Sequence, residues 1–203
     1  MRKTLILVCM LQAFLSYAQK EGNTVNESLK AELELILKKD QEDRIMADSI
    51  EKKFGSQSSE LLMLYERMLL KDSLNQQRIT AIIDQYGWPG KSLVGKEASL
   101  AVFLVIQHAS LEIQKKYLPQ FRESVTKGES SSSNLAYLED RILMREGKPQ
   151  LYGTQVITDN TGQKKFYNIY DEVNVDERRL KIGLGPLADY GKRFNIDYKK
   201  PIK

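Results

Sequence analysis

The chain has 203 residues, of which 41% are hydrophobic and 29% charged, and its formal net charge is only +4 at pH 7. This length is enough for one ordinary hydrophobic core, and the small, mixed charge disfavours nucleic acid as a partner. A single histidine and a single cysteine make a poor ligand set for zinc, and no glycine-rich phosphate loop is present. We therefore expect no metal and no cofactor.

Residues 1–18 have the three-part organisation of a secretory signal peptide. Two basic residues precede an apolar run, and residues 16–18 place small side chains at the −3 and −1 positions before Gln19. The apolar run is too short to remain as a membrane-spanning helix. Cys9 lies in the middle of the run and not at its end, so lipidation is the less favoured alternative. The sequence predicts an exported protein, periplasmic or secreted, with no stable membrane insertion after cleavage.

The chain that remains after such a cleavage has no cysteine. Without disulfide bonds, an exported domain must be held together by the burial of apolar side chains. Residues 19–25 are polar and are expected to form a loose N-terminal segment. Residues 26–203 are expected to form a single helical domain, mainly α, with a small β-hairpin near the C-terminus at about residues 150–170.

Apolar residues at helical spacing, separated by glycine and proline, divide the first part of this domain. The expected helices cover residues 26–54, 60–70, 73–86 and 97–118. Gly55 ends the first helix, and Asp72 or Ser73 is a candidate N-cap of the third. The segment Gly-Trp-Pro-Gly at 87–90 is a turn whose indole is expected to close the end of the core. Pro119 is expected to mark the end of the fourth, central helix.

The second part of the domain changes its periodicity after Gly147. Expected helices cover residues 119–128, 135–146, 171–181 and 186–194. A serine-rich linker at 129–134 supplies Ser133 or Asn134 as an N-cap. Two segments with alternating residues flank Asn160-Thr-Gly162, which is typical of a β-hairpin turn.

Polar residues interrupt the apolar face of the first helix. At 100° per residue the stripe of leucine and isoleucine continues onto Asp40 and Arg44, with Gln41 at its edge. Four residues separate Asp40 from Arg44, so the two side chains can pair on one face. These residues are candidates for a buried site; the alternative is that the helix emerges into solvent there.

Two later helices show the same feature. The face that carries the isoleucines of the third helix meets Asn75 and Asp72 one turn earlier, although Asp72 is equally well explained as an N-cap. In the helix expected from Leu135, Asp140 and Arg141 stand among apolar residues. A charged side chain is seldom buried unless it is paired.

The histidine of this chain, His108, follows a run of large apolar residues and is preceded by Gln107. A buried imidazole needs partners for both nitrogens, and the candidate partners are Asp40, Asp72 and Asp140. We expect His108 to donate one N–H to Asp140 or Asp40 and to turn its other nitrogen toward a small cavity. It is then either a general acid or base or a satisfied core histidine.

A set of short motifs resembles a bacterial family of domains of unknown function. The motifs are Asp40-Gln41-x-x-Arg44, Gly87-Trp88-Pro89, Gln107-His108, Asp140-Arg141 and Gln150-x-Tyr152-Gly153-Thr154-Gln155. The resemblance covers roughly residues 40–190 and implies a mostly helical domain and no assigned activity. It selects the same polar residues as the helical projections, and it adds Gln150, Tyr152 and Gln155.

These polar residues are predicted to converge on a pocket for a small polar ligand. Its predicted catalytic residues are His108, Asp140 and Asp40. Its predicted ligand-binding residues are Arg44, Gln41, Gln107, Arg141, Gln150, Tyr152 and Gln155. Arginine holds carboxylate or phosphate through two parallel hydrogen bonds, and a histidine paired with aspartate moves protons.

Three functional classes agree with this set of residues. The first is a hydrolase- or lyase-type enzyme, the second a non-catalytic binding module, and the third a structural or interaction protein whose polar network specifies the fold. A pocket beside His108 that solvent can reach would favour the first two classes. The sequence does not decide between them, and it predicts no oligomeric state.

Overall fold

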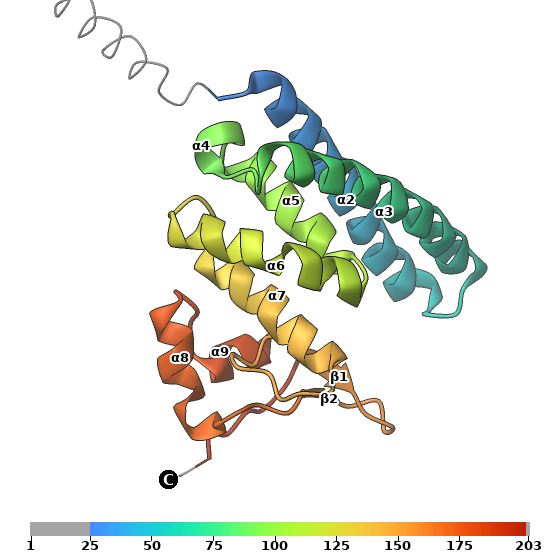
Figure 1. Cartoon of the computed structure of the whole chain (residues 1–203). Helices are drawn as coiled ribbons and strands as arrows, with labels where there is room; N and C mark the ends of the chain where they lie inside the picture. Colours follow the sequence, from blue (N-terminus) through green and yellow to red (C-terminus); the bar gives the residue numbers. More distant parts are fainter. Residues whose placement is uncertain (1–24, 202–203) are drawn as a thin grey trace, which may run out of the picture.

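The computed structural model describes residues 25–201 (Figure 1). The expected signal peptide at 1–18, and nearly all of the loose segment at 19–25, lie outside the described residues. Within 25–201 the chain forms eight α-helices, a short 3-10 helix and a two-stranded antiparallel sheet. The predicted mainly α fold with a small hairpin near the C-terminus is confirmed. None of the described helices combines the length and apolar character needed to cross a membrane.

The two longest helices form an antiparallel pair near the N-terminus. Helix α2 covers Glu27–Phe54 and α3 covers Ser59–Tyr86. The side chain of Asn26 accepts a hydrogen bond from the backbone N–H of Leu29 at 3.0 Å, and Ser58 caps α3 in the same way. Gly55 ends α2 in a left-handed conformation (φ 90°) that glycine adopts without strain. The predicted start and end of the first helix are therefore correct.

The predicted break between residues 70 and 73 is wrong, because α3 runs through it without interruption. Asp72 and Ser73 are good N-cap residues, but neither glycine nor proline stands near them to stop the helix. The carboxylate of Asp72 accepts a hydrogen bond from Arg44 on α2 and caps no backbone N–H. Tertiary contact has here overridden the local capping preference.

The Gly-Trp-Pro-Gly turn leads into α4 (Lys91–Val94). Gly87 has φ 71°, which ends α3 and redirects the chain. The ring of Trp88 is buried and stacks on Phe121 with centroids 4.2 Å apart and planes 16° apart. Trp88 therefore closes one end of the core, as predicted.

The predicted long helix 97–118 is wrong, because it is two helices. Helix α5 covers Lys96–His108 and α6 covers Leu111–Thr126. Ala109 is extended, and the hydroxyl of Ser110 accepts from the backbone N–H of Ile113 at 3.4 Å, which starts α6 as an N-cap. Pro119 lies inside α6 and does not form a boundary. His108 is consequently the last residue of α5.

The C-terminal part begins with α7 (Ser132–Arg145), whose N-cap is Ser131 and not Ser133 or Asn134. Strands β1 (Val156–Thr158) and β2 (Lys164–Phe166) then form the predicted hairpin, with Val156 opposite Phe166. The chain ends with three short helices: η1 (Glu172–Asn174), α8 (Val175–Lys181) and α9 (Leu187–Lys192).

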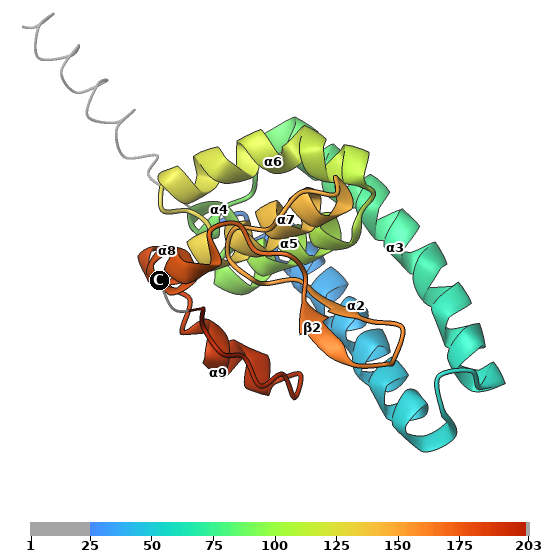
Figure 2. The ribbon, with the colours of Figure 1, turned by 90° about the horizontal axis from the view of Figure 1, so that it is seen from below.

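Helix α5 is the centre of the packing, since it contacts α2, α3, α4, α6 and α7. Its mostly apolar surface explains this position. The main core contains, among others, Leu33, Ile79, Val102, Ile106, Phe121 and Leu138. The far ends of α2 and α3 extend beyond this body as an arm, with a small core of their own around Leu61 and Leu64 (Figures 1 and 2).

Candidate functional site

An ion-pair network joins α2 to α3 beside the end of α5. Arg44 donates to both oxygens of Asp40, with Nη2 2.8 Å from Oδ1 and Nε 3.1 Å from Oδ2. The same Nη2 also lies 3.1 Å from Oδ1 of Asp72. Gln41 donates to Oδ2 of Asp40 at 2.8 Å. The predicted pairing of Asp40 with Arg44 on one helix face is thus present, and α3 contributes a second carboxylate.

The network holds Arg44 in a fixed position. Burial of Arg44 opposes its charge, but hydrogen bonds and the charges of Asp40 and Asp72 raise its pKa above the usual value. Burial raises the pKa of Asp72, and the positive charge of Arg44 opposes that increase. The side chain of Asp40 is only 4% exposed. A buried carboxylate with several charge-assisted hydrogen bonds is a rigid anchor for its arginine.

His108 borders a pocket of about 200 Å³ between α3 and the end of α5. The other lining residues are Asp72, Ser73, Gln76, Val105 and Ala109. The imidazole is partly buried, and its Nδ1 is buried without a hydrogen-bond partner among residues 25–201. A small cavity next to His108, reachable from solvent, is therefore present.

Burial lowers the pKa of His108 to about 4, and the positive charge of Arg44 acts in the same direction. Arg141 and Arg145 lower this pKa further, while Asp40 partly opposes them. The imidazole is consequently neutral at pH 7, with one nitrogen protonated and the other an acceptor.

The expected hydrogen bond from His108 to an aspartate is wrong. In the described part of the chain His108 makes no such bond, and the carboxylates of Asp40 and Asp140 have other donors. The expectation failed because these carboxylates are occupied: Asp40 accepts from Gln41 and Arg44, and Asp140 accepts from the backbone of the segment before the hairpin. Asp40 still acts on His108 through its charge.

Two arginines of α7 reach the end of α5. Nη1 of Arg145 donates to the carbonyl of Ala109 at 2.7 Å, and Nη1 of Arg141 lies 3.4 Å from the carbonyl of Gln107. Cations at the C-terminal end of a helix are favourable. Neither arginine has a carboxylate partner within 25–201, and Nε of Arg141 is buried without any partner. Burial lowers the pKa of Arg141, and the charges of Arg145 and Arg44 add to this effect.

We call the set of Asp40, Arg44, Asp72, His108, Arg141 and Arg145 the His108 cluster. It contains three arginines and two aspartates around a neutral histidine. Sequence analysis named Asp72 as a candidate partner of His108 but not as a catalytic or ligand-binding residue, and it missed Arg145. One signal for Arg145 was available, because Arg145 follows Arg141 by one helical turn and so lies on the same face of α7.

Asp140 belongs to a different arrangement, on another side of α7. Its fully buried carboxylate accepts from the backbone N–H groups of Leu151 (2.7 Å), Tyr152 (3.1 Å) and Thr154 (2.9 Å), and from the Thr154 hydroxyl (2.9 Å). Burial raises the pKa of Asp140, against the effect of these hydrogen bonds. The carboxylate fastens the segment that leads into the hairpin.

The predicted ligand-binding residues of this segment lie with Asp140. Gln150 is fully buried; its Nε2 donates to the carbonyls of Gln155 (2.9 Å) and Tyr167 (2.8 Å), and its Oε1 accepts from the backbone N–H of Gln155 (2.8 Å). The side chain of Gln155 donates to the carbonyl of Tyr137 at 3.3 Å. These amides hold the loop together.

Gln107 lies between the His108 cluster and the residues that surround Asp140. Its Nε2 lies 3.4 Å from the same Tyr137 carbonyl that accepts from Gln155. The structure places Asp40, Arg44, His108 and Arg141 near one another, whereas Asp140 lies with the loop that follows α7. Gln150, Tyr152 and Gln155 gather around Asp140 instead.

The described residues contain no group of three or more histidine, cysteine, aspartate or glutamate side chains able to hold a metal ion.

The fold and the His108 cluster define a helical protein with a small cavity beside a neutral histidine and a partly buried group of arginines and aspartates near it. A family model described as a family of unknown function (DUF6624) matches residues 28–203, and the chain belongs to that family. No curated protein and no solved structure matched the chain.

Proposed function

We propose that the pocket beside His108 binds a small polar anion, and that neutral His108 accepts a proton from it or from water in a hydrolase- or lyase-type reaction. The observation that carries the proposal is Nδ1 of His108, which is buried without a partner at the border of this pocket. Nε of Arg141 is a second such nitrogen in the His108 cluster, although Arg141 does not itself border the pocket. Buried polar groups are nearly always hydrogen-bonded, so such nitrogens indicate a missing ligand group or ordered water.

The charge balance of the His108 cluster favours an anion over a neutral ligand. Asp40 and Asp72 are both engaged with Arg44. Arg141 and Arg145 have only backbone carbonyls as partners within residues 25–201. A carboxylate or phosphate would provide the countercharge that these two arginines lack and would accept two parallel hydrogen bonds from one of them.

The size of the pocket limits the ligand. Sites for drug-sized ligands enclose about 300–1,000 Å³, whereas this pocket has about 200 Å³. The proposed substrate, or the part of it that enters the pocket, is therefore an anion with few non-hydrogen atoms.

Anion binding would also prepare His108 for proton transfer. Without a ligand, the imidazole has a pKa of about 4 and is a weak base. Burial and the charges of the neighbouring arginines cause this low pKa. A bound anion offsets the arginine charges and raises the pKa of His108 toward the range where a general base is effective. In this proposal Asp40 orients Arg44, and Asp140 holds the hairpin segment.

A second candidate is a binding module without catalysis. In it the unpartnered Nδ1 of His108, at the border of the pocket, forms a hydrogen bond with the ligand and transfers no proton. His108→Gln separates the two candidates: it should abolish turnover in the enzyme, and in the binding module it should change anion affinity only a few-fold.

Anion binding is tested by isothermal titration with acetate, malonate and inorganic phosphate. We expect at least one of them to bind the parent protein, and Arg141→Gln to weaken that binding about tenfold, the equivalent of about 1.4 kcal/mol. Arg122→Gln is the matched control, since Arg122 pairs with Glu139 at 2.8 Å and is absent from the His108 cluster. Equal affinity in both variants, or no binding by any anion, would contradict the proposal.

We also propose that the protein is exported and that its mature form begins at Gln19. The support is the signal-like organisation of residues 1–18. N-terminal sequencing of the protein from the native cell should give Gln19 as the first residue. Recovery of cytoplasmic protein that retains Met1 would refute export.

A further inference from the structure

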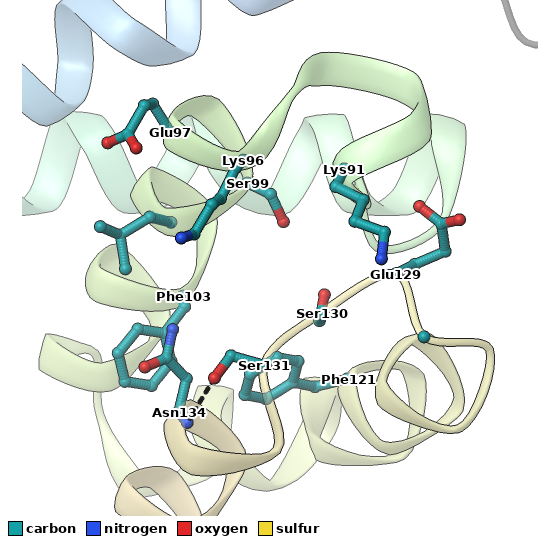
Figure 3. Close-up of a pocket in the computed structure, with 12 residues that line it drawn as sticks. Lys91, Lys96, Glu97, Ser99, Phe103, Phe121, Glu129, Ser130, Ser131 and Asn134 are labelled. Carbon is teal, nitrogen blue, oxygen red and sulfur yellow. Dashed lines mark hydrogen bonds between the residues drawn. The ribbon is translucent and has the colours of Figure 1, made fainter. Parts of the chain in front are cut away.

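A larger pocket of about 480 Å³ lies at the opposite end of α5 from His108 (Figure 3). It is bordered by α4, the first turns of α5 and the connection from α6 to α7. Residues 96 and 108 are the two ends of α5, and at 1.5 Å per residue they are roughly 18 Å apart. This pocket is therefore separate from the His108 cluster.

One wall of this pocket is apolar. Leu100 and Phe103 of α5 and Phe121 of α6 supply it. The rings of Phe103 and Phe121 have centroids 5.8 Å apart, and Trp88 stacks on Phe121. Phe103 is 6% and Phe121 1% exposed, so the accessible part of this wall is Leu100 and a small part of each ring. An apolar ligand group would fit against it.

The rim of the pocket carries two lysines, Lys91 and Lys96, and two glutamates, Glu97 and Glu129. Figure 3 shows the ammonium groups of Lys91 and Lys96 on the pocket side, whereas the carboxylate of Glu97 points away. Neither lysine forms an ion pair within the part of the chain described. Glu129 is occupied by Ser92, whose backbone N–H and hydroxyl donate to it at 2.8 and 2.6 Å. The charge of Lys91 also acts on Glu129, whose pKa it helps to lower, so Lys96 is the lysine that is more available to a ligand.

Ser99 adds a polar group to the lining of the pocket. Its residue is only 8% exposed, and its hydroxyl points into the pocket (Figure 3). In the region 25–201 this hydroxyl has no hydrogen-bond partner, although other serines of the pocket do, such as Ser130, which bonds Ser124 at 2.7 Å. A nearly buried hydroxyl without a partner in an open pocket is suited to donate to a bound acceptor.

We infer that this pocket binds an organic acid with an apolar or aromatic body. The carboxylate would lie between Lys91 and Lys96 and accept from Ser99, while the body would lie on Phe103 and Phe121. The backbone N–H groups at the start of α5 add to the attraction, since no side chain caps that end. The volume falls within the range of about 300–1,000 Å³ usual for small-molecule sites.

The tryptophan of this chain reports directly on the pocket. The sequence contains one tryptophan, and that residue, Trp88, stacks behind the Phe121 wall. Titration with 3-phenylpropionate should therefore change Trp88 fluorescence in a saturable way. The uncharged 3-phenylpropan-1-ol tests the need for the carboxylate, and inorganic phosphate tests the need for the apolar body. Both should bind at least about tenfold more weakly.

Charge-removing variants test the assigned residues. The double variant Lys91→Gln/Lys96→Gln changes two exposed side chains and should weaken 3-phenylpropionate binding at least about tenfold, a change of about 1.4 kcal/mol. Ser99→Ala should weaken it a few-fold. Lys165→Gln, on β2, is the matched control and should bind like the parent, as should His108→Gln. Melting curves verify that each variant is folded.

Three results would overturn the inference. These are a fluorescence titration with no saturable change, equal affinity for the acid and the alcohol, and unchanged affinity in the folded double variant. Because His108→Gln leaves this pocket intact, failure here is distinguishable from failure of the anion site at His108.

Discussion

The fully buried carboxylate of Asp140 gives the clearest stability prediction. In Asp140→Ala four donors lose their acceptor: three backbone N–H groups and the Thr154 hydroxyl. A buried donor left without a partner costs about 1–3 kcal/mol. The N–H groups of Leu151 and Tyr152 are only part-buried, so water can replace part of the lost hydrogen bonding. The variant also no longer buries the charge of a carboxylate. We therefore expect a loss of about 3–5 kcal/mol in the free energy of unfolding.

Asp140→Asn should have an intermediate effect, about 2 kcal/mol, because one oxygen remains as an acceptor while the new amide N–H₂ faces other donors. Urea unfolding followed by circular dichroism measures both variants. Hydrogen exchange of the Leu151, Tyr152 and Thr154 amides shows whether the loss is local, since these amides should exchange faster in either variant.

The matched control is the neighbouring residue Glu139, which pairs with the exposed Arg122 at 2.8 Å. The Arg122 side chain is 54% exposed and that of Glu139 14% exposed, so water reaches the pair from the arginine side. Pairs accessible to water contribute about 0–1 kcal/mol, so Glu139→Ala should change stability by about 1 kcal/mol or less. If Asp140→Ala is no more destabilised than Glu139→Ala, the argument that Asp140 organises the hairpin segment is refuted.

Two further substitutions test the other buried groups. Arg44→Met removes the partner of the Asp40 carboxylate, which is 4% exposed, and should cost about 3–5 kcal/mol; urea unfolding that matches the parent would show that water replaces the guanidinium. Trp88→Ala should cost about 3–5 kcal/mol because the ring is buried on Phe121; a thermal melt like that of the parent would show that the stacking contributes little.

The parts of the fold that local chemistry determines were predictable from the sequence. Glycine in a left-handed conformation at Gly55 and Gly87 ended helices where expected, and Asn160-Thr-Gly162 gave the hairpin. The errors occurred where tertiary contacts compete with local preference. Asp72 pairs with Arg44 and leaves α3 uninterrupted, so its capping preference was misleading.

The break at Ala109 and Ser110 was the most consequential omission. The segment carries no glycine or proline, and its only local signal is a serine three residues before an isoleucine, which is common inside helices too. Continuing one helix through it assigned residues 111–118 to the faces of α5, although they belong to α6. The residues of the candidate site were recognisable as polar groups on apolar faces. Which of them join the His108 cluster and which gather around Asp140 depends on the path of the chain after α5.

The imidazole of His108 offers the most direct test of the proposed anion site, since it is the only histidine of the chain. Nitrogen-15 NMR of the protein without a histidine tag should give a pKa of about 4, and saturating malonate should raise it. Because this pKa is lowered on folding, His108 stabilises the native state above pH 6.5, and this contribution is lost as the pH falls toward 4. A pKa near 6.5 that no small anion shifts would contradict the account.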